Sequence, residues 1–342
     1  MTETLNLLEQ QARNRRQTSL WLLLFILFFA WLGFGGDAVL YFGSMDQFGA
    51  AHYSVPWIGI AVTLIAAIVA WNSWARGPKQ VLWAAGGVEL TNPQSHEEKQ
   101  LLNVVEEMAI AAGLPRPKVY IVEDADPNAF ATGHGPESAC IAVTRGLLSA
   151  LNREELQAVV AHEMGHVRNL DVRLMTLIAA LVGVVVILSD GMGRIFRGGG
   201  GRLLGGRGRK GGGGGAIMIV LLVLWVVTLI LAPIITRFMA MAVSRNREYL
   251  ADATGAELTR NPAALASALQ KIESAAAPTA SIKRGTAHLC IADPLGRKVN
   301  SKEGAMANLL GTHPPMAMRV SRLNGMAFQA AKAPGDQPRT GG

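Results

Sequence analysis

The sequence His162-Glu-Met-Gly-His166 constrains this chain more than any other feature. On an α-helix, His162 and His166 are four residues apart and therefore project from the same face. Two imidazoles at this spacing can bind one zinc ion, and Glu163 beside them can take a proton from a water that the metal activates. A surface helix can contain the same pattern by chance, so the surrounding residues have to support it.

The residues around this pattern are those of a helix with a buried apolar face. Asn152 is a suitable N-cap, and Glu155 follows three residues later, as in a capping box. Apolar residues then recur at helical spacing, namely Leu156, Val159, Val160, Met164 and Val167. No proline interrupts residues 152–188. The sequence therefore predicts that both histidines lie on a helix.

A catalytic zinc site needs a third protein ligand and keeps its fourth position for water. Glu248 is the candidate, within the segment Ser244–Asp252. Asp252 shares a helical face with Glu248, and we expect it to accept a hydrogen bond from the free ring nitrogen of a zinc histidine, His162, and so to fix its tautomer. Taken alone, this segment also fits a solvated helix with local ion pairs, but its pairing with the upstream motif favours a metal site.

Four apolar segments are candidates for membrane spans. Half of the residues are hydrophobic and only 17% are charged. A span needs about 20 mainly apolar residues, so the third segment is short. The segments are residues 19–35, 55–74, 174–189 and 216–236. Arginines precede the first segment, but its apolar core is long and no small-x-small cleavage site follows, so we predict an uncleaved anchor.

The charges between these segments predict an orientation. Three arginines between residues 13 and 16 precede the first segment, and Arg76 and Lys79 follow the second. The loop 36–54 between the two segments contains two aspartates and no Lys or Arg. The positive-inside rule therefore places the amino terminus and the chain after residue 76 in the cytoplasm.

The linker between the third and fourth segments gives conflicting evidence. Residues 190–215 contain fourteen glycines, five arginines and one lysine against one acid, so the rule opposes an outside location. Yet the ligands on either side must meet, so the chain crosses the membrane an even number of times between them. We expect a hairpin that enters the membrane, fully or in part. The linker itself is expected to be disordered and to contact anionic lipid. It matches no phosphate-binding pattern, since Lys210 is followed by Gly211, and no nucleic-acid partner is predicted.

The pattern of elements predicts an α+β fold, in which a mostly helical domain with a small sheet is combined with transmembrane helices. Helices are expected at residues 97–112, 261–275 and 314–328, and strands at 118–123, 128–133 and 139–145. An exposed edge of such a sheet can bind an extended peptide. The expected parts are a membrane anchor (1–75), two catalytic segments (76–173 and 237–330), the hairpin (174–236) and a disordered tail (331–342).

Several blocks together resemble one family, the HtpX-type integral-membrane zinc endopeptidases. The blocks are Pro127–Gly133, His162–His166 with Asp171, Arg247–Asp252, and Thr312–Pro315 with Arg319. The resemblance covers about residues 1–330, and the wider clan includes the endopeptidases that process prenylated CAAX proteins. It implies a zincin-like fold in the bacterial plasma (inner) membrane, with several passes and an active site that faces the cytoplasm. It also implies a stress-response role in quality control.

The resemblance also implies roles for single residues. One zinc ion per chain is expected on His162, His166 and Glu248, with Glu163 as general base. His313 and Asn128 are candidates for stabilising the oxyanion, Asn128 at the substrate-binding sheet edge, and Arg319 is expected to brace the site. The alternatives are a helix-start loop for His313, a turn residue for Asn128 and a surface cation for Arg319.

The implied partners are unfolded or damaged membrane proteins as substrates, the lipid bilayer, and other membrane proteases or chaperones. One alternative is an intramembrane zinc protease. Charged residues surround the zinc motif, among them Arg153, Glu154, Arg168 and Asp171, and so many charges at bilayer depth oppose that alternative. Another alternative is an inactive scaffold on a protease fold. The presence of all three ligands and Glu163 argues against it, and metal analysis with a proteolysis assay separates these classes.

Overall fold

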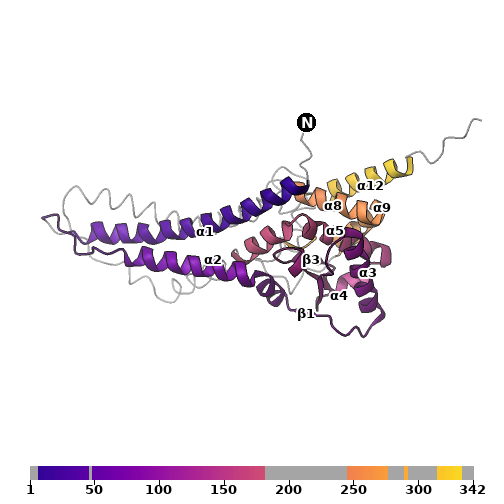
Figure 1. The fold of residues 1–342 in the computed structure, drawn as a ribbon, viewed down its shortest axis with the longest axis horizontal. Coiled ribbons are helices and arrows are strands. Elements are labelled where there is room, and N and C mark those ends of the chain that lie inside the picture. The colour runs from indigo at the N-terminus through magenta and orange to yellow at the C-terminus, as the bar shows by residue number, and fades with distance from the viewer. Residues whose placement is uncertain (1–6, 46–47, 182–244, 276–288, 292–313, 333–342) are drawn as a thin grey trace, which may run out of the picture. The chain divides into compact units, whose positions relative to one another are not determined.

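The computed structural model describes residues 7–45, 48–181, 245–275, 289–291 and 314–332 (Figure 1). The chain divides into two compact units. The first unit comprises residues 1–14, 78–176 and 241–342, and the second comprises residues 15–77 and 177–240. The first unit carries the sheet and the zinc motif.

Two long helices, α1 (Leu7–Gly43) and α2 (Trp57–Ala84), supply most of the described second unit. Both are long and apolar enough to cross a membrane; α1 contains the predicted span 19–35, and α2 contains all but the first two residues of the predicted span 55–74. Large apolar side chains along them remain exposed, including Leu27, Trp31, Leu64, Ile65, Ile68 and Trp71. A soluble protein seldom exposes so much contiguous apolar surface, so these faces suit lipid.

An acidic side chain joins the two helices. Asp37 of α1 is buried and accepts hydrogen bonds from the backbone N–H groups of Ile58 (3.1 Å) and Gly59, in the first turn of α2. The Tyr53 hydroxyl donates a further hydrogen bond to the same carboxylate. Asp37 therefore satisfies backbone donors that the first turn of a helix leaves open.

The described residues cover only part of the predicted hairpin. The chain is helical from Asp171 to Leu181, which includes the first half of the predicted third span. Leu177 and Leu181 pack with Phe25, Ala66 and Ala70 within the second unit. The rest of the third span, the glycine-rich linker 190–215 and the fourth span lie outside the described residues.

The first unit contains a four-stranded sheet in the order β1-β2-β4-β3. The strands are β1 (Gly87–Glu89), β2 (Lys118–Val122), β3 (Ala129–Thr132) and β4 (Cys140–Thr144). The β2–β4 pair is parallel, and the β1–β2 and β3–β4 pairs are antiparallel. Three strands lie where the sequence predicts them. The sequence missed β1, which is too short to show an alternating pattern.

Helices pack around this sheet, so the predicted α+β class is confirmed. Besides the ends of α1 and α2 and the helical residues 171–176, the described first unit has the helices α3 (His96–Ala112), α4 (Arg145–Ala150), α5 (Arg153–Arg168), α8 (Arg245–Thr259), α9 (Pro262–Ser274) and α12 (Met316–Lys332). A 3₁₀ turn, η1 (Pro136–Ser138), lies between β3 and β4. The sequence analysis did not predict α4. Helix α12 includes the first two residues of the predicted tail, and the remaining tail residues lie outside the description.

The predicted capping box starts α5 and also ties it to α9. Asn152 Oδ1 accepts the Glu155 N–H (2.9 Å), and the Glu155 carboxylate accepts the Asn152 N–H (2.9 Å). The same buried carboxylate binds Ser267 and Lys271 of α9, both at 2.7 Å. Glu155 therefore fixes both the start of α5 and its packing.

Helix α5 lies at the centre of the first unit, in contact with α3, α8, α9 and β3. All residues from Ala158 to Val167 are buried, so the helix is enclosed on every side and does not have the single buried face that the sequence indicated. The polar residues His162, Glu163 and His166 are therefore buried as well. Buried polar groups require partners, so polar groups on the neighbouring elements must face these three side chains.

Two glycines allow α5 and α8 to approach at backbone distance. A Cβ atom on Gly165 would lie 3.2 Å from the Ala251 Cα, and one on Gly255 would lie 3.1 Å from the His162 backbone nitrogen. These distances are shorter than ordinary contacts. A side chain at either position would therefore require the neighbouring helix to move by a few tenths of an ångström.

We expect Gly255→Val to force α8 away from α5 and to lower the free energy of unfolding of the metal-free protein by about 1–3 kcal/mol, as overpacking does. Chemical denaturation in detergent with a chelator present measures this change. Gly325→Val in α12 is the matched control, because a Cβ at Gly325 meets no atom within 4 Å. Equal effects of the two substitutions would show that the close approach is unimportant.

Candidate metal centre

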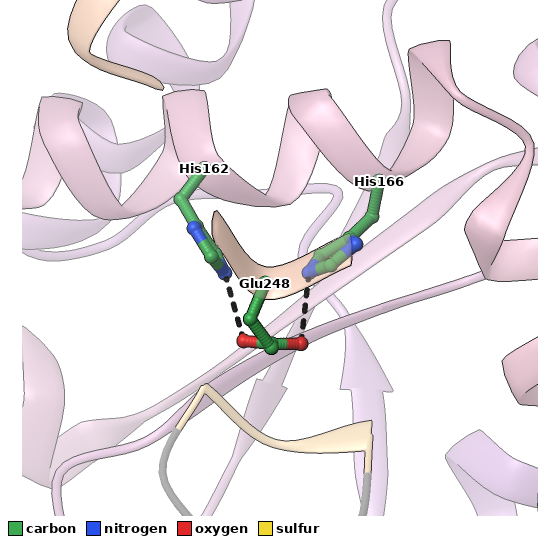
Figure 2. A group of neighbouring side chains, drawn as sticks. All are labelled: His162, His166 and Glu248. Atoms are coloured by element: carbon green, nitrogen blue, oxygen red, sulfur yellow. Dashed lines mark ion pairs between the residues drawn. The ribbon is translucent and has the colours of Figure 1, made fainter. Parts of the chain in front are cut away.

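Three predicted ligands meet between α5 and α8. The His162 Nε2 lies 3.8 Å from Glu248 Oε2, and the His166 Nε2 lies 3.6 Å from Glu248 Oε1. One ligand atom of each residue lies within 4.8 Å of the others, and all three residues are buried. Figure 2 shows both rings directed from α5 toward the Glu248 carboxylate.

This donor set fits a divalent metal. Two imidazoles and one carboxylate are the protein ligands of a known class of catalytic zinc sites. Atoms that bind one ion at about 2 Å lie at most about 4 Å apart, and both separations from Glu248 to the rings meet that limit. The carboxylate of Glu248 is also buried, and a cation would compensate its charge.

Asp252 lies behind His162, as the sequence predicts. The His162 Nδ1 is 3.0 Å from Asp252 Oδ1, on the side of the ring away from Glu248. Arg319 holds the same carboxylate with two contacts, Nε to Oδ2 at 2.9 Å and Nη2 to Oδ1 at 2.7 Å. Burial alone would raise the pKa of Asp252, but Arg319 outweighs it and lowers the pKa to about 2. Asp252 is therefore an anion that can hold a proton on Nδ1, which leaves Nε2, 3.5 Å from the Arg319 Nη2, as the ring atom that could bind a metal.

Arg319 is fully buried and joins three parts of the site. Besides Asp252, its Nη1 donates to the Ile291 carbonyl (2.9 Å) and lies 3.4 Å from Glu248 Oε2. The neighbouring acids raise the pKa of Arg319 despite its burial, so the guanidinium stays charged. The alternative of a surface cation is wrong, because one guanidinium links α12 to α8 and to residues 289–291.

His166 has a carboxylate partner that the sequence analysis noted only as part of a motif. The His166 Nδ1 lies 3.4 Å from Asp171 Oδ2. Burial lowers the pKa of His166, but Asp171 and Glu248 raise it more, to about 9. Leu170 has a left-handed backbone (φ 60°) directly after α5, and this turn brings Asp171 back toward the ring. An acid just beyond the helix end was the signal available in the sequence.

Glu163 lies between the ligands and the sheet. Its side chain is buried, and the Ala131 backbone N–H of β3 is a hydrogen-bond donor to it. Burial raises the pKa of Glu163, and the two neighbouring histidines oppose that rise. A carboxylate with a raised pKa is better matched to accepting and returning a proton near neutral pH.

Of the other two predicted site residues, the structure describes only Asn128. Asn128 is buried at the start of β3, where its backbone N–H donates to Thr144 Oγ1 (2.9 Å) and its Oδ1 accepts the Ala129 N–H (3.1 Å). It is thus held by the β3–β4 pair. His313 lies outside the described residues.

Strand β3 is an edge strand, but the expectation of an exposed edge is wrong. All four of its residues are buried. At its start the Ile291 N–H donates to the Ala129 carbonyl (2.9 Å), so residues 289–291 cover that position. At its end the Gly133 N–H donates to Thr176 Oγ1 (3.2 Å). The covering segment lies far away in the sequence and has no pattern of its own, so the sequence could not reveal it.

Known proteins are similar to this chain over most of its length. The family model "Peptidase family M48" matches residues 95–327, which include the three ligands, Glu163, Asp171, Asp252 and Arg319. A protein called "Protease HtpX homolog" from Thermoanaerobacter pseudethanolicus is 40% identical over 326 residues, 94% of this chain and 98% of that protein. The chain belongs to peptidase family M48.

A second relative agrees with the M48 assignment. A "Protease HtpX homolog" from Listeria monocytogenes is 52% identical over 227 residues, covering 66% of this chain and 73% of that protein. A crystal structure of Ste24p from S. mikatae is more distant, with a TM-score of 0.43 at 17% identity over 90% of this chain and 66% of that chain. Family membership and two helices of membrane length make this protein a membrane-bound metalloendopeptidase.

Removing the buried guanidinium should destabilise the fold of this M48 peptidase. We expect Arg319→Met to leave the Asp252 charge buried without its partner and to lower the free energy of unfolding of the metal-free protein by about 3–5 kcal/mol. Arg322→Met, one turn further along α12, is the matched control. Arg322 is exposed and stacks on Tyr249 (3.7 Å), so we expect a loss of about 1 kcal/mol or less. Similar losses for both variants, measured by chemical denaturation, would contradict the role of Arg319.

Proposed function

We propose that this protein is a zinc endopeptidase of the bacterial plasma membrane that hydrolyses unfolded or damaged membrane proteins. One zinc ion per chain would bind to His162, His166 and Glu248. The observation that carries this proposal is the convergence of three buried ligand atoms from α5 and α8, with Glu163 beside them. Two helices that are far apart in the sequence bring these groups to one point.

Bound zinc would polarise the substrate carbonyl and make a nearby water more acidic. The chain's own residues supply the proton transfers. The Glu163 carboxylate accepts a proton from the attacking water and returns it to the leaving amine nitrogen. Its burial and its raised pKa suit both steps. Asp252 and Asp171 lie at the Nδ1 sides of His162 and His166, so the Nε2 atoms of both rings would be the ones to hold the metal.

The surroundings of Glu163 favour an extended substrate. His162 and Glu163 are almost fully buried, so a folded protein surface cannot reach them. Edge strands bind extended peptides through backbone hydrogen bonds, and β3 passes beside Glu163 at Ala131. Because the β3 edge is covered in this structure, a substrate strand would have to displace residues 289–291 from the Ala129 carbonyl before it could pair there. Within the proposal, Asn128 and His313 remain the candidates for stabilising the oxyanion, and Arg319 acts as a positioning residue.

The location follows from charge and exposure. The exposed apolar faces of α1 and α2 suit a bilayer. Arg13, Arg15 and Arg16 lie in the first turns of α1, before its apolar stretch, and Arg76 and Lys79 lie in α2 after its apolar stretch. We therefore place the M48 domain in the cytoplasm and residues 44–56 outside, in a multi-pass protein of the inner membrane. Damaged membrane proteins at the cytoplasmic face are then accessible as substrates, and a chaperone or second membrane protease could deliver or share them.

We expect Glu163→Gln to bind zinc like the wild type and to lose proteolysis by about 10⁴-fold or more. The amide has nearly the same shape, but it cannot accept the water proton at neutral pH. General acid–base catalysis alone contributes about 10²–10⁴-fold, and here the same group also forms the nucleophile. Cleavage of an unfolded membrane protein in detergent and elemental zinc analysis measure the two quantities.

Glu248→Ala is the matched control for that experiment, because it removes the carboxylate that is proposed to bind the metal, whereas Glu163→Gln removes the one that is proposed to transfer the proton. It should lose both zinc and activity. Near-normal cleavage by zinc-loaded Glu163→Gln would refute the proton-transfer role, whereas full zinc occupancy in Glu248→Ala would remove Glu248 as a ligand.

The orientation predicts which single cysteines an impermeant thiol reagent can reach from outside intact cells. Phe48→Cys, in the loop between the spans, should be labelled, and Ile110→Cys on α3 should be protected until the cells are opened. Both side chains are highly exposed, at 85% and 75%, so access depends on the membrane alone. The native Cys140 and Cys290 are buried and contribute little background. Labelling of Ile110→Cys but not of Phe48→Cys would invert the topology.

A further inference from the structure

The first turns of α1 precede the predicted span and belong to the first unit, with the metal centre. Asn14 lies in this segment and is buried, although its neighbours Arg13 and Arg15 are exposed. Its Nδ2 donates to Asp171 Oδ1 at 2.7 Å and to the Asn169 carbonyl at 2.8 Å. Both hydrogens of one amide group therefore bind the turn that follows α5.

Asp171 connects this amide to a metal ligand. Its Oδ2 lies 3.4 Å from the His166 Nδ1, while its Oδ1 receives Asn14 and lies 3.6 Å from the Arg247 Nε. The carboxylate is fully buried, so its direction is set by these neighbours. Contacts thus run from α1 through Asp171 to His166, all between buried side chains.

The choice of residue at position 14 supports a polar role. Asparagine is a poor helix former, and burying its amide is unfavourable unless it is hydrogen-bonded. If α1 only had to pack at this point, leucine would fill a similar volume with a better helix propensity. An amide donor is needed when the group opposite is a buried carboxylate that must point in one direction.

We propose that Asn14 is a positioning residue for the metal centre, which acts through Asp171 on the His166 ring. The helix that anchors the protein in the membrane thereby contributes to metal affinity as well as to attachment. This inference rests on the proposed zinc site. It assigns a function to the segment before the first span, whose arginines served only to predict the orientation.

A simpler role would be docking of α1 against the turn after α5, and the chain offers a matched control for it. Gln11 lies one turn earlier on α1, and its Nε2 donates to the Arg168 carbonyl at 2.8 Å. It holds the same two helices together without contacting Asp171 through any described hydrogen bond. Gln11→Ala therefore removes a docking contact and leaves the Asp171 carboxylate with its Asn14 donor.

The test measures zinc affinity of the full-length protein in detergent by competition with a chromogenic chelator. Loss of a group that orients a metal ligand weakens binding by about 10–100-fold, and an effect passed through that group should be at or below the lower end, roughly 3–10-fold for Asn14→Ala. Gln11→Ala should change affinity less than about twofold. In an Asp171→Ala background, Asn14→Ala should have no further effect, because the group it acts through is gone.

Asn14→Leu serves as a second variant that keeps the helix and its packed volume, and it should weaken zinc binding as Asn14→Ala does. Equal affinity losses for Gln11→Ala and Asn14→Ala, or an undiminished Asn14 effect in the Asp171→Ala background, would overturn the inference in favour of docking. Unchanged affinity in both Asn14 variants would overturn it as well. Failure of the wild-type protein to bind zinc would instead refute the proposed function, so the two failures are distinguishable.

Discussion

The backbone contact between α5 and α8 is the constraint on which the site depends. Gly165 and Gly255 leave no Cβ between the two helices, and Gly255 faces the backbone of His162 itself. At this spacing, two side chains four residues apart on each helix face each other, so the histidine pair of α5 meets Glu248 and Asp252 of α8. Glu248 then faces the Nε2 atoms of both rings, and Asp252 faces the Nδ1 atom of His162. A wider crossing would separate the ligands by more than one ion can bridge.

Burial of so many charges requires compensation, and the fold provides it in two similar arrangements. Behind His162, Asp252 is neutralised by Arg319 of α12. Behind His166, Asp171 is held by Asn14 and approached by Arg247. Each histidine thus has a carboxylate at Nδ1, and each carboxylate has a donor from an element distant in the sequence. The order of the metal centre is therefore tied to the packing of α1, α8 and α12, and metal binding and stability should be linked.

The sequence predicted those parts of the structure that local patterns specify. The capping box at Asn152, the helical spacing of the two histidines and the pairing of Glu248 with Asp252 depend on neighbouring residues. The contact of Asp252 with His162 was expected because a zinc-binding histidine usually donates its other ring N–H to a carboxylate. Three features depended on residues far apart in the sequence and could not be predicted: the enclosure of α5 on all sides, the cover of the β3 edge by residues 289–291, and the contact of Asn14 with Asp171. The ion pair of Arg319 with Asp252 was missed for the same reason, although Arg319 was expected to brace the site.

The central claim is that one metal ion joins α5 to α8 through His162, His166 and Glu248. Anomalous diffraction from crystals of the zinc-loaded protein, recorded on both sides of the zinc absorption edge, tests it most directly. The account predicts one strong peak per chain, with the Nε2 atoms of both histidines and a Glu248 oxygen at about 2.0–2.2 Å from it. A peak that excludes Glu248, or one located at Asp171 or Asp252, would contradict the account. In either case the close contact of α5 and α8 would not serve to bring Glu248 to the metal.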